Sequence, residues 1–197
     1  MYTDFHKAFD KVHHQLLLDK LYLYGIRDPL LSWFNSYLMN RSQSVCLKGV
    51  KSYTYSVKSG VPQGSILGPF LFNIFVNDIT MNFLSKSLLY ADDLKMYHFI
   101  KTTDDMKILQ HDLKLVEKWC FMNDLNLNVS KCVAICFSKK SSPINASYVL
   151  NNELLKDESI VKDLGIYFDS KLTFHCHYDS LIAKARKLIG CIKRWSV

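Results

Sequence analysis

The stretch LLYADDLKMYHF, residues Leu88 to Phe99, places two adjacent carboxylates between two short apolar runs. Apolar runs of this length that flank turn-forming residues are typical of a β-hairpin. We therefore predict strands over 88–91 and 94–99, with Asp92 and Asp93 at the tip. An Asp-Asp pair by itself is most often an ordinary turn, so a chemical role for this pair depends on its surroundings.

On both sides of this hairpin, helical and strand-like patterns follow one another along the chain. Before it, the patterns predict a strand at 2–5, helices over 8–24, 28–39 and 65–79, and a strand hairpin over 44–48 and 53–58. After it, they predict a helix over 106–120, strands near 131–137, 148–155 and 161–168, and a basic amphipathic helix over 178–195. Because these elements do not follow strict βαβ alternation, the predicted fold class is α+β.

Turn and cap residues set the limits of several of these elements. Gly25 is expected to end the first helix, and Asp28-Pro29 to begin the second. Ser65 is a candidate cap for the helix that follows the Gly/Pro-rich loop. Turns are predicted at Lys48-Gly49 and Asn151-Asn152.

The composition fits a folded domain with a large apolar interior. Of the 197 residues, 49% are hydrophobic and 22% are charged, which excludes an intrinsically disordered chain. The formal net charge of +7 fits a polyanionic partner. The longest apolar stretch, Ile66–Val76, is too short to span a bilayer, and Asp4 stands where a secretory signal would be apolar. We therefore expect no membrane contact and a cytoplasmic or nuclear location, not secretion.

The six cysteines are scattered and do not form the framework of a disulfide scaffold. The pair Cys132 and Cys136 and the cluster His175-Cys176-His177 match the spacing of no common zinc module. Residues 132–137 are also largely apolar, as expected for a strand. We therefore reject zinc and expect free, buried thiols.

Three carboxylates stand where acidic side chains are otherwise unfavourable: Asp4 ends a predicted strand, and Asp92 and Asp93 interrupt an apolar hairpin. A carboxylate at one strand end and a pair on a neighbouring hairpin have the oxygen ligands to hold two divalent cations. Two such cations activate an attacking oxygen and stabilise a leaving one in phosphoryl transfer, and Mg²⁺ suits this task.

The surroundings of these carboxylates resemble the reverse transcriptases, most closely those of non-LTR retrotransposons. The resemblance is carried first by DFHKAFD (4–10), SGVPQGSILGP (59–69) and YADD (90–93). Further similar strings follow in the family's order: YLMNRSQSV (37–45), PFLFNIFVNDI (69–79), NLNVSKC (126–132) and VKDLGIYFDSKLTF (161–174). Together they span almost the whole chain.

The resemblance implies a polymerase palm over residues 1–170, in which a ferredoxin-like antiparallel sheet is backed by helices. Residues 171–197 would begin a helical thumb. Asp4 and Asp92 would bind two Mg²⁺ ions, for which Mn²⁺ can substitute, and Asp93 would complete the acidic triad with a less direct role. We expect Asp4 and the Asp92-Asp93 hairpin to lie on adjacent strands.

The same resemblance implies roles for several other residues. Phe5, Phe9, Gln63 and Gly64 would bind the nucleotide, and the ring of Phe9 would exclude a 2′-hydroxyl. Phe9 equally fits a plain core residue, and Gln63-Gly64 an ordinary tight turn. Lys131 would protonate the departing pyrophosphate. The primer end would be gripped by Leu164, Gly165 and Ile166. The basic residues of the last helix would follow a duplex backbone, or form a solvated face: Lys184, Arg186, Lys187, Lys193 and Arg194.

The function implied is an RNA-directed DNA polymerase that uses an RNA template, a DNA primer and dNTPs. An alternative is a non-catalytic nucleic-acid-binding remnant of a retrotransposon. An RNA-dependent RNA polymerase shares the metal chemistry, but Phe9 at the sugar position speaks against it. Because the family's fingers precede the position of Asp4, we expect a palm without fingers and little or no activity from this chain alone.

Overall fold

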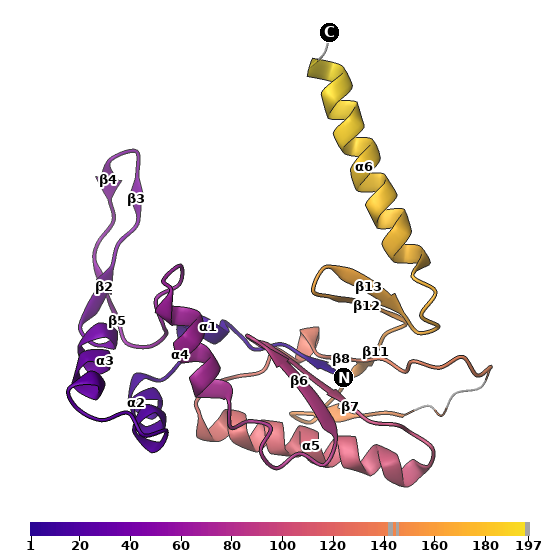
Figure 1. Cartoon of the computed structure of the whole chain (residues 1–197), viewed down its shortest axis with the longest axis horizontal. Helices are drawn as coiled ribbons and strands as arrows, with labels where there is room; N and C mark the ends of the chain where they lie inside the picture. The colour runs from indigo at the N-terminus through magenta and orange to yellow at the C-terminus, as the bar shows by residue number, and fades with distance from the viewer. Residues whose placement is uncertain (142–143, 145, 196–197) are drawn as a thin grey trace.

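The computed structural model describes residues 1–141, 144 and 146–195, and its centre is a five-stranded sheet (Figure 1). The strands run in the order β11 (Lys156–Asp157), β8 (Val133–Ala134), β1 (Tyr2–Thr3), β7 (Asp93–Tyr97) and β6 (Lys86–Tyr90). All neighbours are antiparallel except β11 and β8, so the sheet is mixed at one edge, where a purely antiparallel sheet was expected.

The predicted hairpin is confirmed, but its tip is Ala91-Asp92 and not Asp92-Asp93, because Asp93 is the first residue of β7. Strands β6 and β7 pair with Tyr90 opposite Asp93, which leaves Ala91 and Asp92 as a two-residue turn. Ala91 adopts a φ of 51°, the positive value that such tight hairpin turns require.

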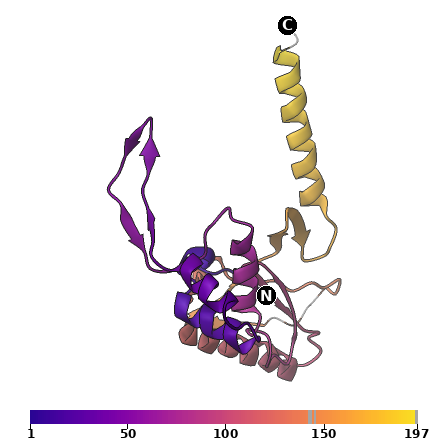
Figure 2. The ribbon, with the colours of Figure 1, turned by 60° about the vertical axis from the view of Figure 1, so that its left-hand side comes forward.

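Helix α5 (Thr103–Met122) runs beneath the sheet in both ribbon views (Figures 1 and 2). Its stripe of buried side chains matches the predicted helix, and it meets the buried residues Leu94 and Met96 of β7 in one core. Helix α4 (Leu67–Val76) adds Leu71 and Phe72 to that core. The mixture of sheets and helices agrees with the expected α+β class.

One carboxylate joins three of the helices. Asp78, just after α4, accepts hydrogen bonds from Lys20 Nζ (2.7 Å) and from Trp119 Nε1 of α5 (2.9 Å). The side chain of Lys20 is only 11% exposed, and its ammonium also lies over the ring of Trp119. Burial of this ammonium lowers the pKa of Lys20, while the neighbouring Asp78 counteracts the shift.

The predicted single helix over 8–24 is wrong, because it is divided into α1 (Ala8–Lys11) and α2 (His14–Leu23). At the break, the loop that begins at Ser59 packs against residues 9–12. The N–H of Gly60 donates to the carbonyl of Val12 (2.8 Å), and the N–H of Val61 donates to that of Phe9 (2.8 Å). These long-range bonds favour an extended conformation at Val12 over a continuous helix.

The stop residue Gly25 is confirmed, and the cap candidates Asp28 and Ser65 bond to first-turn N–H groups, although the N-cap positions themselves are Pro29 and Ile66. Gly25 follows α2 with a φ of 93°. Asp28 Oδ1 accepts a hydrogen bond from the N–H of Ser32 (3.1 Å) at the start of α3 (Leu30–Leu38). Ser65 Oγ accepts one from the N–H of Gly68 (2.9 Å) in the first turn of α4.

Residues 41–58 form an arm that projects from the body (Figures 1 and 2). Its base pairs β2 (Arg41–Gln43) with β5 (Tyr55–Val57), and its end pairs β3 (Cys46–Leu47) with β4 (Val50–Lys51). The predicted turn at Lys48-Gly49 is confirmed. Every residue from 42 to 56 is exposed.

The C-terminal part differs from expectation in one strand. The turn at Asn151-Asn152 joins β9 (Val149–Leu150) to β10 (Glu153–Leu154), as predicted. The single strand predicted over 161–168 is instead a hairpin of β12 (Ile160–Asp163) and β13 (Ile166–Asp169). Its turn residues Leu164 and Gly165 have φ values of 44° and 89°, which no strand allows. The strand expected near 131–137 is reduced to the two residues of β8, which follows the short 3₁₀ helix η1 (Val129–Lys131).

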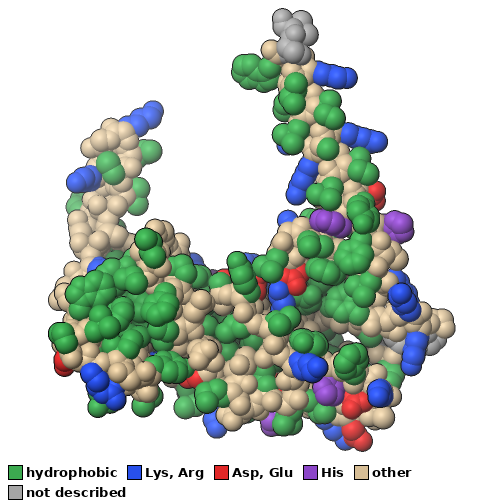
Figure 3. Space-filling view, in the orientation of Figure 1, with side chains coloured by type: hydrophobic (Ala, Val, Ile, Leu, Met, Phe, Trp, Pro, Cys, Tyr) green, Lys and Arg blue, Asp and Glu red, His purple; other side chains and the backbone are tan. Residues whose placement is uncertain are grey.

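The last element, α6 (His175–Trp195), extends away from the body and buries none of its residues (Figures 1 and 3). Across the described part of the chain, none of the helices has the length and hydropathy needed to cross a bilayer.

The thiol predictions are partly correct. Cys120 and Cys132 are buried, and burial raises the pKa of Cys120 to about 12. Cys46, Cys136 and Cys176 are exposed. The strand expected to bury Cys136 ends at Ala134, two residues before it.

Replacing Gly60 by alanine should destabilise the fold strongly. Gly60 has a φ of 86°, and a Cβ there would lie 2.7–2.8 Å from backbone atoms of Asp10. We expect Gly60→Ala to cost at least about 3 kcal/mol, measured by urea unfolding. Gly49→Ala is the matched control, because Gly49 has a φ of 83° but open space around it; about 1 kcal/mol is expected there. Equal losses would show that the close approach to Asp10 is unimportant.

Replacing Asp112 by alanine should also destabilise the protein. The buried carboxylate of Asp112 in α5 accepts hydrogen bonds from the N–H groups of Leu84 (3.1 Å) and Ser85 (2.7 Å), which lead into β6. Losing their acceptor should cost about 1–3 kcal/mol, whereas Asp104→Ala on the exposed start of α5 should cost little.

The Asp112 contribution should depend on pH. Burial alone would raise the pKa of Asp112, but hydrogen bonds involving Ser85 and Leu84 outweigh burial and hold it below its usual value. The stabilisation is therefore complete above the unfolded-state pKa and is lost as the pH falls through the lower folded-state pKa. The gap in unfolding free energy between wild type and Asp112→Ala should narrow on acidification; a constant gap would contradict this.

Candidate active site

Pairing between β1 and β7 brings the two acidic segments together. The antiparallel register is set by the pairs Tyr2–Lys95 and Thr3–Leu94. Continuing it by one residue puts Asp4 across from Asp93. The strands are adjacent as expected, since β1 pairs with β7 of the acidic hairpin, but Asp4 itself lies one residue beyond the end of β1.

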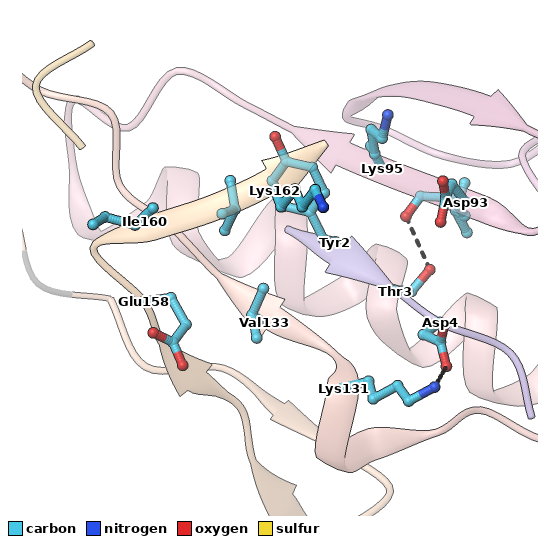
Figure 4. Close-up of a pocket in the computed structure, with 12 residues that line it drawn as sticks. Tyr2, Thr3, Asp4, Asp93, Lys95, Lys131, Val133, Glu158, Ile160 and Lys162 are labelled. Atoms are coloured by element: carbon cyan, nitrogen blue, oxygen red, sulfur yellow. Dashed lines mark hydrogen bonds and ion pairs between the residues drawn. The ribbon is translucent and has the colours of Figure 1, made fainter. Parts of the chain in front are cut away.

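Alternation along these strands gives the two faces of the sheet different chemistry. The side chains of Thr3 and Leu94 are buried, whereas Asp4 and Asp93 are partly exposed. Both carboxylates line an open cleft of about 460 Å³ (Figure 4). Three carboxylates and three ammonium groups line this cleft: Asp4, Asp93 and Glu158, and Lys95, Lys131 and Lys162.

The segment NLNVSKC (126–132) holds Asp4 in place on the side of β1 that faces away from β7. The N–H of Asn128 donates to the carbonyl of Asp4 (2.8 Å), and the N–H of Asp4 donates to Cys132 Sγ (3.4 Å). Helix η1 turns between these two contacts and directs Lys131 toward the cleft. Its Nζ lies 3.6 Å from Asp4 Oδ2 (Figure 4).

Negative charge accumulates around Asp93. Burial raises the pKa of Asp93, and the charges of Asp92, Asp163 and Asp4 raise it further, while Lys95 acts in the opposite direction. An additional cation at this position would relieve the repulsion between the carboxylates.

The donor set fits a hard divalent cation. Within residues 1–141, 144 and 146–195, no group of three or more His, Cys, Asp or Glu side chains is arranged to hold a metal ion. Asp4 and Asp93 nonetheless share the cleft, and Asp92 lies in the adjacent turn without lining it. One or two carboxylates, completed by water and substrate phosphates, are a common protein environment for Mg²⁺.

The residues expected to bind the nucleotide lie in two different environments. The ring of Phe5 is 3% exposed and packs near Trp119, so its side chain belongs to the core. Phe9 is partly buried and stacks on Phe72, with ring centroids 4.4 Å apart.

Gln63 and Gly64 lie on the exposed loop that docks beside Phe9. Gln63 Nε2 donates a hydrogen bond to Asp10 Oδ1 (2.8 Å), and Gly64 adopts a φ of 80° with open space around it. The loop and the chain around Phe9 are thus brought together, whereas neither Phe9 nor Gln63 lines the cleft of Asp4 and Asp93.

The residues expected to grip the primer form the turn of the β12–β13 hairpin. The side chains of Leu164 and Ile166 are exposed, and Gly165 has open space around it. Strand β12 itself lines the cleft with Ile160, Val161 and Lys162, so the hairpin lies beside the acidic residues.

Sequence reasoning missed the charged groups that join this hairpin to the sheet. The ammonium of Lys95 on β7 forms an ion pair with the carboxylate of Asp163 on β12. The available signal was the position of Lys95, two residues after Asp93 and therefore on the same face of the strand. Nothing in the sequence indicated its partner, which lies 68 positions further along the chain.

Known proteins are similar to this chain over most of its length, including the residues of the cleft. A family profile described as "Reverse transcriptase (RNA-dependent DNA polymerase)" matches residues 1–184. The chain is 33% identical over 187 residues to a probable RNA-directed DNA polymerase from transposon BS of Drosophila melanogaster, covering 90% of this chain and 20% of that protein. It is 31% identical over 195 residues to the RNA-directed DNA polymerase from mobile element jockey of Drosophila funebris, covering 91% and 20%.

A more distant relative also comes from a retrotransposable element. The Pol polyprotein from the type-1 retrotransposable element R2 of Popillia japonica is 25% identical over 191 residues, covering 85% of this chain and 30% of the relative. The chain thus spans only about a fifth of the first two relatives' length. The matches nevertheless include every motif that carried the resemblance, and the chain belongs to the reverse transcriptase (RNA-dependent DNA polymerase) family.

Proposed function

We propose that this chain is the catalytic palm of an RNA-directed DNA polymerase. The observation that carries the proposal is the β1–β7 register, which brings Asp4 and Asp93 together in the lining of one open cleft. We interpret residues 1–170, with the central sheet backed by α4 and α5, as a ferredoxin-like palm. Residues 171–197 would begin the thumb with α6; the last two of them lie outside the described residues.

In this proposal, Asp4 and the hairpin carboxylates Asp92 and Asp93 hold the divalent cations. When bound, two Mg²⁺ ions would activate the primer 3′-hydroxyl and neutralise charge on the dNTP phosphates, and Mn²⁺ can substitute. The protein's own contribution is to fix Asp4 directly after β1, Asp93 at the start of its partner strand β7, and Asp92 in the tight turn before β7, so that pairing of β1 with β7 sets their positions. The raised pKa of Asp93 supports a centre that gains from cation binding.

Lys131 is the proposed proton donor to the leaving pyrophosphate. The side chain of Lys131 is 66% exposed and its Nζ lies 3.6 Å from the Asp4 carboxylate, so the ammonium is able to turn toward a phosphate bound at the cleft. A protonated amine placed there delivers a proton and also offsets the charge that develops on the leaving group.

Phe9, Gln63 and Gly64 are proposed to shape the sugar and base site. The stack of Phe9 on Phe72 leaves little freedom for its ring, and a fixed ring discriminates against a 2′-hydroxyl by bulk. The ring of Phe5 lies in the core, so any nucleotide contact of Phe5 would come from its main chain. The exposed turn Leu164-Gly165-Ile166 would contact the primer end.

Two projecting elements favour a nucleic-acid partner. No aspartate or glutamate occurs between Asp28 and Asp78, whereas this stretch contains Arg41, Lys48, Lys51 and Lys58. Lys48 and Lys51 lie at the exposed end of the arm, and α6 carries a second basic group of residues. Cationic side chains on exposed elements around an open cleft suit an RNA template and a DNA primer.

One observation favours the non-catalytic alternative. The described residues hold no ready group of three metal-ligating side chains, and Lys131 lies close to the carboxylate of Asp4. A nucleic-acid-binding remnant would keep the basic surfaces without binding the cation. The catalytic palm and the non-catalytic remnant are therefore distinguished by cation binding and nucleotide incorporation, and not by RNA affinity.

Removal of a carboxylate should abolish nucleotide incorporation. Single-nucleotide incorporation on a primed RNA template with Mg²⁺ is the sensitive measurement. We expect any incorporation by the wild-type chain to fall to background in Asp4→Asn and in Asp92→Asn, because each variant loses a proposed cation ligand. Binding of the primed template should change less than threefold.

The control is Asp104→Asn, which removes the same charge from an exposed position on α5. It should incorporate nucleotides as the wild type does. Binding of the primed template without Mg²⁺-dependent incorporation by the wild type would favour the remnant. Incorporation that survives Asp4→Asn would contradict the proposed centre.

Neutralising the end of the arm should weaken binding of single-stranded RNA. We expect Lys48→Gln/Lys51→Gln to lower the slope of log affinity against log salt by about 1.4, which corresponds to two lost phosphate contacts. Fluorescence anisotropy of a labelled RNA at several KCl concentrations measures this slope. The matched control Lys114→Gln/Lys118→Gln removes two exposed lysines from α5, beneath the sheet, and should leave the slope unchanged. Equal slopes in the two double variants would exclude the arm as a phosphate contact.

A further inference from the structure

The ion pair between Lys95 and Asp163 joins the central sheet to the β12–β13 hairpin, which shares no strand pairing with it. Strands β12 and β13 pair only with each other in the described sheets. The two charged side chains are 13% and 16% exposed, so the pair is largely shielded from water. Ion pairs with this degree of burial interact more strongly than exposed ones, and losing one partner leaves an unfavourable unpaired charge.

Tyr2 of β1 completes this contact. Tyr2 lies close enough to the Asp163 carboxylate for that negative charge to act on its hydroxyl, and Lys95 Nζ lies 5.9 Å from the centre of its ring. Burial and the negative charge of Asp163 together raise the pKa of Tyr2 to about 12. Asp163 is therefore paired with Lys95 of β7, and its charge also acts on Tyr2 of β1.

Lys95 has other acceptors within the same cleft. Asp93 lies two residues earlier on the same face of β7, and Asp4 lies across from Asp93. Lys131 is already close to Asp4. If Asp163 did not hold Lys95, a second ammonium group would be available to the acidic centre and would compete there with a divalent cation.

We propose that Asp163 is a positioning residue that holds Lys95 away from Asp4 and Asp93 and, through the same ion pair, fastens the β12–β13 hairpin beside the cleft. The inference rests on the proposed function, since it assigns Asp163 and Lys95 roles around the proposed cation centre. One carboxylate thus sets both the charge of that centre and the position of the hairpin that would meet the primer.

Mn²⁺ binding to the whole chain, followed by electron paramagnetic resonance, tests the first role without requiring catalysis. Asp163→Asn should weaken Mn²⁺ binding roughly tenfold, the effect expected of one released positive charge near the ligands. Glu158→Gln is the matched control, because it removes a negative charge from the same cleft without releasing Lys95. It should change the affinity less than threefold.

The double variant Asp163→Asn/Lys95→Met separates positioning from a merely structural role. It lacks the ammonium that would compete with the cation, so its Mn²⁺ affinity should return to within threefold of wild type. Amide hydrogen exchange over residues 160–169 should be faster in both variants, because neither has the ion pair. A structural role alone would leave Mn²⁺ binding as weak in the double variant as in Asp163→Asn.

Lys95→Met alone provides a second test if Asp163→Asn does not fold. It should bind Mn²⁺ at least as tightly as the wild type, and weaker binding would overturn the inference. Unchanged Mn²⁺ affinity in a folded Asp163→Asn would overturn it as well, while the proposed function would stand. If the wild type and Asp4→Asn both failed to bind Mn²⁺, the proposed centre and this inference would fall together.

Discussion

The antiparallel register between β1 and β7 is the constraint on which the rest of the site depends. Thr3 and Leu94 face the core, so a shift of β1 by one residue would turn the carboxylate of Asp4 inward. Burying that charged carboxylate without a partner is costly, and the shift would also break the hydrogen bond that Thr3 Oγ1 donates to the carbonyl of Leu94 (3.0 Å), so both effects favour the observed register. Packing of Thr3 and Leu94 in the core thus sets the positions of the neighbouring carboxylates, and no further interaction is needed to bring Asp4 and Asp93 together.

A second contact brings the glycine-rich loop to Phe9. The hydrogen bonds from Gly60 and Val61 to the chain at Val12 and Phe9 replace helical bonds that a continuous helix over 8–24 would have made. The close approach of Gly60 to Asp10 leaves no room for a side chain at this position. The break in the helix and the glycine at position 60 therefore have the same cause, which is the close packing of the loop against residues 9–12.

Local patterns predicted the elements that depend on nearby residues. The acidic hairpin, the buried stripe of α5 and the turn at Asn151-Asn152 each follow from periodicity or turn chemistry within a few residues. The failures share a different cause. The first helix is broken by a loop some fifty positions away, and an apolar run that resembled one strand folds back at Leu164-Gly165. Competing long-range hydrogen bonds and packing are invisible to a pattern read along the chain.

The sequence by itself determined the family, the acidic residues and the α+β class, because side-chain type, spacing and hydrophobic periodicity are local properties of the chain. Only the tertiary structure decided that Asp93 shares the cleft with Asp4 while Asp92 lies in the turn. It also decided that the ring of Phe5 belongs to the core and that Lys95 pairs with Asp163. These outcomes depend on strand pairing and on competition between charges from distant segments, which form only when the core packs.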